Sequence, residues 1–194
     1  MKIYKPFLTT MLLALFFISC KKDNSEKAIE VVADTIAVQT IDTAALIQKA
    51  KSDMIKLAKP YNVSEDAQLR IDKLVEQANK EGKNVLIQAG GNWCIWCLRF
   101  TDFIENTPEL KTILDNNYLY YHLNYSKENK NEAVFEKYAP NGRELGFPFF
   151  IVIDKKGDVL DVISSETVAN EEDQETYYDI LKTKELFLKY APNK

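Results

Sequence analysis

The chain has 194 residues, of which 46% are hydrophobic and 28% are charged, and its formal net charge is −4 at pH 7. These values are typical of a globular protein, and the length suits one domain with a short extension. Because the sequence contains no basic stripe with interleaved aromatic residues, we expect no nucleic-acid partner.

The N-terminal residues are typical of an export signal. Two lysines precede the apolar run Phe7–Ile18, which is too short to span a membrane. The run stops beside Cys20, and a serine followed by cysteine resembles the cleavage site of bacterial lipoproteins. We expect a lipoprotein signal peptide at residues 1–19, lipidation of Cys20 and a tether at residues 20–42, with an ordinary signal peptide as the alternative. The protein would be extracytoplasmic and lipid-anchored, on the periplasmic face or at the outer membrane, since Lys21 is not the aspartate of an inner-membrane retention signal.

Two helices are expected at the start of the predicted domain, residues 43–194. Apolar residues recur at helical spacing over residues 43–59, and Pro60 ends that helix. A second helix should begin at an N-cap on Ser64 and stop at Gly82.

The later segments alternate between strand and helix patterns. An apolar run at 84–89 predicts a buried strand, and a helix should follow it from Cys94 towards Pro108. Further along, we expect a strand at 118–125, a helix at 132–138, a hairpin of strands at 147–154 and 158–164, and a helix at 171–190 with a break near Thr183. This order predicts an α/β fold.

Cys94 and Cys97 follow the first strand and could serve several chemistries. Haem attachment needs a histidine after the second cysteine, but Leu98 stands there. Structural zinc needs about four ligands, whereas the chain offers two thiols and His122, which we interpret as a core or surface histidine. A module that binds copper(I) through two thiolates, or that docks a partner without turnover of the pair, stays an alternative. So does a structural disulfide, although so short a loop restrains little of the unfolded chain.

Redox exchange accounts best for where the pair stands. A cysteine at a helix N-terminus has its thiolate favoured by free backbone N–H groups and by the helix dipole. Cys94 would hold that position, and Cys97, one turn later, could reach it. The expected cycle is attack on a disulfide by Cys94, a mixed disulfide, and its resolution by Cys97.

Two segments carry a family resemblance. NVLIQAGGNWCIWCLRF resembles the active-site segment of thioredoxin-like proteins, and ELGFPFFIVIDKKGDVL resembles their cis-proline strand and hairpin. The resemblance covers residues 64–190 and looks closest to secreted bacterial members with an added N-terminal helix. It implies a thioredoxin-like fold, in which helices flank a central mixed sheet. It also implies a site around the cysteines that is lined by Trp93, Ile95, Trp96, Phe147 and the cis-proline Pro148.

The sequence departs from the family pattern at two places. Gln88 occupies the position of the buried aspartate that helps to move the proton of the resolving thiol, so water or another carboxylate would have to act instead. The dipeptide Ile95–Trp96 carries no charge and no histidine, and a Trp-Cys-x-x-Cys motif of this kind resembles thioredoxins more than oxidases, which implies a disulfide reductase. We expect protein disulfides or thiols as substrates, an upstream thiol donor, and neither a cofactor nor a metal.

Overall fold

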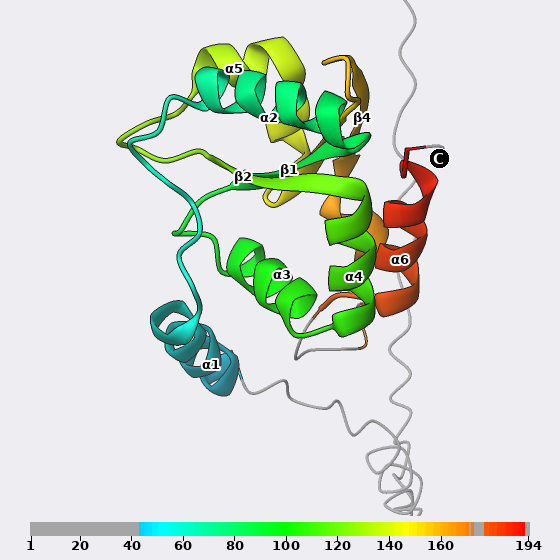
Figure 1. Cartoon of the computed structure of the whole chain (residues 1–194). Helices are drawn as coiled ribbons and strands as arrows, with labels where there is room; N and C mark the ends of the chain where they lie inside the picture. Colours follow the sequence, from blue (N-terminus) through cyan, green and yellow to red (C-terminus); the bar gives the residue numbers. More distant parts are fainter. Residues whose placement is uncertain (1–42, 171, 173–176, 193–194) are drawn as a thin grey trace, which may run out of the picture. The chain divides into compact units, whose positions relative to one another are not determined.

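The computed structural model describes residues 43–170, 172 and 177–192. These residues belong to one compact unit (Figure 1). The predicted signal peptide, the tether and Cys20 lie outside the described residues. None of the described helices is both long and apolar enough to cross a membrane.

A mixed four-stranded sheet with the order β2-β1-β3-β4 forms the centre. The strands are β1 Asn84–Gly90, β2 Tyr118–Asn124, β3 Phe149–Ile153 and β4 Val159–Ser164. β1 pairs with β2 in parallel, while β1–β3 and β3–β4 are antiparallel. The thioredoxin-like α/β fold with a central mixed sheet is therefore confirmed.

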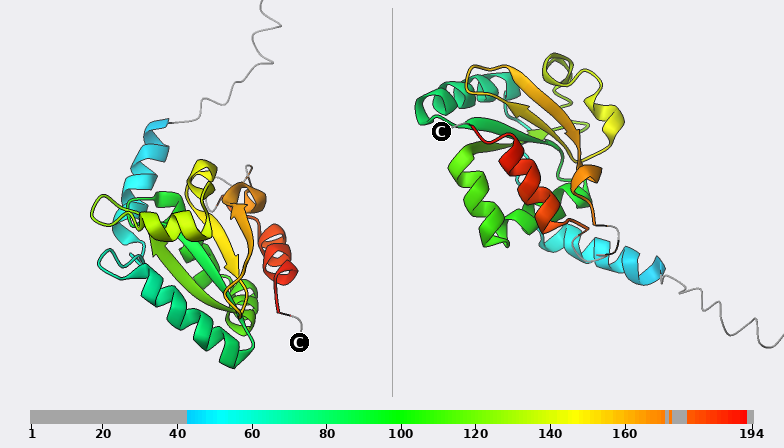
Figure 2. Two further views of the ribbon diagram at one scale, coloured as in Figure 1. Left: turned by 90° about the horizontal axis from the view of Figure 1, so that it is seen from above. Right: turned by 90° about the vertical axis from the view of Figure 1, so that its right-hand side faces the viewer.

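Helices cover both faces of the sheet, as Figures 1 and 2 show. Their bounds are α1 Thr43–Lys56, α2 Ala67–Glu81, α3 Ile95–Glu105, α4 Pro108–Asn117, α5 Glu132–Tyr138 and α6 Ile180–Lys189, with short 3₁₀ helices η1 Gly142–Leu145 and η2 Ser165–Val168. Val85 and Ile87 of β1 join the core under α2 and α5, whereas Leu86 joins the core under α3, α4 and α6. Burial on both faces explains why β1 is a continuous apolar run.

The N-cap of α2 differs from the prediction. The side chain of Asp66 accepts a hydrogen bond from the backbone N–H of Leu69 at 2.9 Å and caps the helix. Ser64 was the wrong choice, because its hydroxyl instead donates to the side chain of Asn62 in the preceding turn. The helix ends at Gly82, whose φ of +68° is the left-handed conformation that glycine adopts readily.

A helix that the sequence reading missed lies between α3 and β2. The helix from the cysteines ends at Asn106, and Pro108 then opens α4 rather than merely stopping α3. Proline is suited to the first turn of a helix because the N–H that it lacks has no partner there. Together α3 and α4 form the crossover that parallel pairing of β1 and β2 requires.

The last helix is shorter than predicted. α6 begins after Asp179, whose side chain accepts from the backbone N–H of Lys182 and caps the helix. Before it, Ala169 and Tyr178 form an antiparallel bridge, so a helix from residue 171 was wrong. The break expected at Thr183 is also absent, since Thr183 is buried in mid-helix and its N–H bonds to the Asp179 carbonyl.

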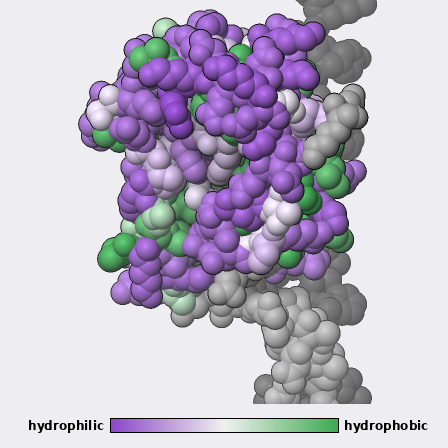
Figure 3. All heavy atoms as spheres, viewed as in Figure 1, coloured by the Kyte–Doolittle hydropathy of each residue, from purple (hydrophilic) through white to green (hydrophobic). Residues whose placement is uncertain are grey.

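The predicted N-terminal helix is present as α1. It contacts α3 through Asp53, whose carboxylate accepts from Arg99 Nη2 at 2.6 Å and from Nε at 3.0 Å. Its outer side stays exposed, including Ile47 and Ile55. Figure 3 shows hydrophobic residues on the part of the surface where α1 lies.

Candidate active site

The cysteine pair stands where β1 turns into α3. Cys94 is the N-cap of α3 in an extended backbone conformation, and its Sγ accepts the backbone N–H of Cys97 at 3.1 Å. The two sulfurs form a disulfide. Cys94 is 5% exposed and Cys97 is 0% exposed, so the N-terminal sulfur is the one nearer to solvent. This geometry suits Cys94 as the attacking thiol and Cys97 as the resolving thiol.

The cis-proline segment faces Cys94, as the resemblance implies. The Phe147–Pro148 peptide bond is cis, and Pro148 is buried. The carbonyl oxygen of Phe147 lies 3.6 Å from Cys94 Sγ. Residues from two distant parts of the chain therefore meet at the sulfur that would attack a substrate.

Aromatic rings border the cysteines on one side. Trp93 is 53% exposed, and its indole N–H donates to the Tyr125 carbonyl at 2.6 Å. The Phe147 ring packs edge-on against Trp93 at 5.6 Å and stacks on Tyr125 at 5.3 Å. Trp93 and Tyr125 also line a largely apolar pocket of about 370 Å³. Trp93 is held rigidly by these contacts and can present an apolar surface to a partner.

The dipeptide between the cysteines lies on the other side. Ile95 is half-buried, whereas Trp96 is 38% exposed. The Trp96 ring packs on Tyr177 at 4.7 Å, and the Arg99 guanidinium lies 4.8 Å from its centroid. Trp96 and Phe147 border a second pocket of about 250 Å³. Trp96 therefore both covers the start of α3 and keeps an exposed edge beside the cysteines.

Gln88 occupies the centre of a buried polar network behind Cys97. Its side-chain nitrogen donates to the Cys97 carbonyl at 2.8 Å and to the Tyr61 hydroxyl at 2.6 Å. Its side-chain oxygen accepts from the Tyr120 hydroxyl, and the Thr101 hydroxyl oxygen lies 3.5 Å away. Because the Cys97 carbonyl can only accept, the nitrogen must point towards it, which fixes the orientation of the amide. No carboxylate takes part in the bonds of Gln88 among the described residues.

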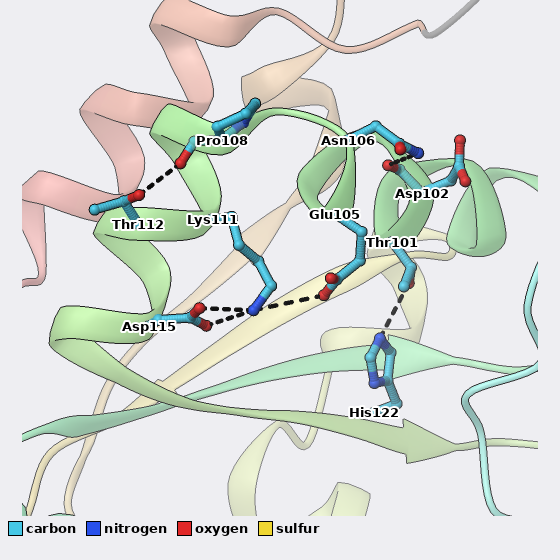
Figure 4. A network of polar contacts seen from close by, with 9 residues as sticks. All are labelled: Thr101, Asp102, Glu105, Asn106, Pro108, Lys111, Thr112, Asp115 and His122. Atoms are coloured by element: carbon cyan, nitrogen blue, oxygen red, sulfur yellow. Dashed lines mark hydrogen bonds and ion pairs between the residues drawn. The ribbon is translucent and has the colours of Figure 1, made fainter.

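His122 of β2 is bonded to Thr101, as Figure 4 shows, and through Thr101 it adjoins the network of Gln88. Thr101 donates to the Cys97 carbonyl at 3.1 Å, so His122 Nε2, 3.0 Å from the Thr101 oxygen, supplies the proton of their shared bond. Burial lowers the pKa of His122 from 6.5 to about 4, so the ring is neutral at pH 7. This placement agrees with a histidine satisfied within the core.

Four residues of the site are not predicted by sequence reasoning. They are Tyr61, Asn92, Thr101 and Tyr120. Thr101 lies one turn after Cys97 and Tyr120 two positions before His122, so their spacing on predicted elements was a usable signal. Tyr61 lies in a connecting segment after Pro60, and no local pattern places such a residue next to the cysteines.

The described residues offer no group of three or more histidine, cysteine, aspartate or glutamate side chains that could hold a metal ion. A metal at this site would therefore depend on the two cysteine sulfurs. Two-coordinate binding of this kind is the form that copper(I) accepts.

Comparisons with known proteins agree with this geometry. A family model described as thioredoxin-like matches residues 66–155. A search of curated proteins gave no match. Among solved structures, the chain is similar to a disulphide isomerase from Xylella fastidiosa Temecula1, with a TM-score of 0.57 and 19% identity over 69% of this chain and 97% of that one. A sequence identity of 19% shows a similarity of fold and nothing about activity.

Proposed function

We propose that the protein is a thiol–disulfide oxidoreductase that works outside the cytoplasm as a disulfide reductase. The match of residues 66–155 to the thioredoxin-like family model and the Cys94–Cys97 disulfide within them support this proposal. The observation that carries the proposal is the Cys94 sulfur at the N-terminus of α3, where it is bonded to Cys97 and lies 3.6 Å from the carbonyl oxygen that precedes cis-Pro148. A cysteine sulfur at this position can ionise, attack a substrate disulfide and then be released from the mixed disulfide by Cys97.

The proposed cycle transfers two electrons from the dithiol to a substrate. The Cys94 thiolate attacks a substrate disulfide, a mixed disulfide forms, and one substrate sulfur leaves and takes up a proton. Cys97 then attacks the Cys94 sulfur, which breaks the mixed disulfide and releases the second substrate thiol. The protein is left as the Cys94–Cys97 disulfide, and an upstream thiol donor restores the dithiol.

The surroundings of Cys94 favour reduction over oxidation. A strongly oxidising pair owes its potential to stabilisation of the reduced form, chiefly of its thiolate. Here the Cys94 sulfur accepts the N–H of Cys97 and lies at a helix start, while Ile95 and Trp96 add no charge. The one cation of α3, Arg99, is paired with Asp53. The thiolate therefore has the helix start to stabilise it but no additional unpaired cation on α3 or in the dipeptide, which supports a more reducing couple.

The direct test is reduction of insulin disulfides by the wild-type protein supplied with dithiothreitol. We expect turnover in the wild type and loss of it in Cys94→Ser and in Cys97→Ser. Cys97→Ser should additionally trap a mixed disulfide through Cys94. If Cys94→Ser traps partners and Cys97→Ser does not, the two roles are reversed.

Equilibration of the pair with glutathione buffers measures the direction of electron flow. We expect a potential nearer to about −270 mV than to about −120 mV, the two ends of the family range. A value near the upper end, together with oxidation of reduced ribonuclease, would make the protein an oxidase. Correction of scrambled ribonuclease without net reduction would make it an isomerase. Tight stoichiometric copper(I) binding without insulin reduction would favour a copper-binding module.

Anchoring through Cys20 is a separate part of the proposal. It rests on the apolar run that ends at this cysteine in the sequence. In a Gram-negative host, the wild type should fractionate with membranes after a high-salt wash, and Cys20→Ser should be soluble or unprocessed. A Cys20→Ser protein of mature size that stays with membranes would rule out lipidation as the anchor.

A further inference from the structure

Tyr61 lies outside the residues that match the thioredoxin-like family, yet it packs with Cys94, Cys97 and Leu98 in one buried cluster. We propose that the Tyr61 hydroxyl donates a hydrogen bond to the Cys97 thiolate when that thiolate forms. The segment ahead of the family-matched residues would then complete the active site. The inference rests on the proposed redox function and names a further residue for it.

The backbone of Tyr61 is fixed next to the cysteine turn. Its N–H donates to the Asn92 side-chain oxygen at 3.1 Å, and its carbonyl accepts from the Asn92 side-chain nitrogen at 2.8 Å. The Tyr61 side chain is 2% exposed, and its ring packs edge-on against His122 at 5.1 Å. Asn92 comes two residues before Cys94, so the amide ties Tyr61 to the loop that carries the pair.

A gap at Gly90 brings the hydroxyl and the sulfur together. A Cβ atom placed on Gly90 would lie 2.5 Å from Cys97 Sγ and 2.8 Å from the Tyr61 oxygen. Both atoms therefore border the same small space, and any larger residue at position 90 would collide with them. The absence of a side chain at Gly90 leaves the Tyr61 oxygen and the sulfur of the resolving cysteine next to the same space.

The hydrogen-bond directions leave the Tyr61 proton available. Gln88 donates to the Tyr61 oxygen, so the oxygen acts as an acceptor in that bond. The Gln88 nitrogen cannot be exchanged with its oxygen, because the same nitrogen faces the Cys97 carbonyl. The hydroxyl of Tyr61 consequently keeps its own proton for a second partner, and Cys97 Sγ lies across the gap.

The chemistry of resolution gives that proton a use. Cys97 is fully buried, and apolar surroundings solvate a thiolate poorly. A neutral donor next to the sulfur offsets part of this penalty through a hydrogen bond to the charged form. Burial raises the pKa of Tyr61 well above 10, so the phenol donates without ionising. The proton that leaves Cys97 ends on the released substrate thiol, and Tyr61 returns unchanged.

The other groups near Cys97 cannot supply the same charge stabilisation. Burial raises the pKa of Tyr120, whose proton is already given to Gln88. His122 is neutral and bonds to Thr101. On α3, the Arg99 guanidinium is paired with Asp53.

The test measures ionisation of Cys97 without any need for turnover. In a Cys94→Ala background, the alkylation rate of Cys97 is followed against pH with and without Tyr61→Phe. A hydrogen bond to a charged group has the strength to move the midpoint upward by about one pH unit. Tyr138→Phe, a buried tyrosine that accepts from Gln68 away from the cysteines, is the matched control and should not move it.

A second variant distinguishes loss of the hydrogen bond from a folding defect caused by Tyr61→Phe. Replacing Tyr61 by 3-fluorotyrosine keeps the ring and makes the hydroxyl a stronger donor, so the midpoint should move downward. Opposite shifts in the two variants support the proposal. An unchanged midpoint in both overturns it, even if the wild type reduces insulin. Failure of the wild type to reduce insulin would instead overturn the proposed function, whatever the alkylation midpoints are.

Discussion

The side-chain nitrogen and the side-chain oxygen of Gln88 both form hydrogen bonds, so replacing Gln88 should lower the stability of the protein. Aspartate is shorter and has no N–H, so Gln88→Asp removes the donors to Tyr61 and to the Cys97 carbonyl and buries a carboxylate. We expect the free energy of unfolding of the oxidised protein to fall by about 1–3 kcal/mol. The new carboxylate could still speed release of the mixed disulfide as a base, which the sequence alone suggests.

Urea denaturation and single-turnover reduction separate these two effects. Gln88→Asn is the control, since it has the same length as aspartate and keeps an amide. A Gln88→Asp protein as stable as the wild type would contradict the need for the amide donors. The rates of mixed-disulfide release are compared across pH 6 to 9, since a general base acts best at about pH 7. Equal rates in the wild type and in Gln88→Asp would show that the lack of a base at position 88 does not slow the reaction.

His122 makes the stability of the fold depend on pH. Its folded pKa of about 4 lies below the ordinary 6.5, so the unfolded chain binds more protons between these values. The stabilisation is complete above about pH 6.5 and is lost as the pH falls towards 4, by about 3 kcal/mol at most. Urea denaturation at pH 7, 6 and 5 measures the slope. His122→Gln should flatten it, and an unchanged slope in that variant would assign the effect to other groups.

The residues of the site differ in how far the sequence could reveal them. Cys94, Cys97 and Pro148 sit in short local patterns, so their positions could be read directly. Gln88 was identified as a buried position, and its full burial agrees with that. Tyr61 contacts Gln88 from 27 residues away through an irregular segment, and the path of such a segment depends on packing that no local pattern encodes.

At the scale of elements, one ion pair and apolar packing join α1 to α3 and the cysteine cluster. Arg99 binds Asp53 with two N–H groups, and Met54 and Leu57 pack near the cysteine cluster. The two charged side chains are only 10% and 21% exposed. Removing one partner should therefore release α1 at a cost of about 1–3 kcal/mol, with little effect on the rest of the fold.

Limited trypsin digestion measures that release, because α1 carries several lysines. We expect faster cleavage within α1 in Asp53→Asn and in Arg99→Gln, and no further acceleration in the double variant. The surface pair Lys111–Asp115 supplies a control, since its loss in Asp115→Asn should not change cleavage in α1. Additive effects in the double variant would mean that the two residues hold α1 independently.

Helices and strands with strong periodic apolar patterns were predicted well. Helix boundaries that depend on a capping residue or on a proline were not. β1 and α2 follow clear apolar patterns. α4 was missed because Pro108 has the same appearance whether it ends one helix or opens the next. The start of α6 was placed too early because the bridge between Ala169 and Tyr178 is a tertiary contact that overrides helix propensity there.

For the whole molecule, folding and redox state are linked. The difference in unfolding free energy between the oxidised and the reduced protein equals the difference in the free energy of forming the disulfide in the folded and unfolded chains. A reducing pair is one whose disulfide the fold favours, so a reductase should be more stable when oxidised. An oxidising pair reverses the order, because its fold favours the reduced form.

We therefore expect the oxidised protein to unfold at higher urea concentration than the reduced protein at pH 7. Each 30 mV by which folding lowers the potential corresponds to about 1.4 kcal/mol of added stability in the oxidised form. A Cys94→Ser/Cys97→Ser variant, which cannot form the disulfide, should match the reduced protein and should not respond to oxidant. The expected sign follows from the surroundings of the Cys94 sulfur, which accepts the N–H of Cys97 but has no charged side chain in the intervening dipeptide to stabilise a thiolate further. A reduced protein that is the more stable form would contradict the proposal of a reductase and would favour an oxidase.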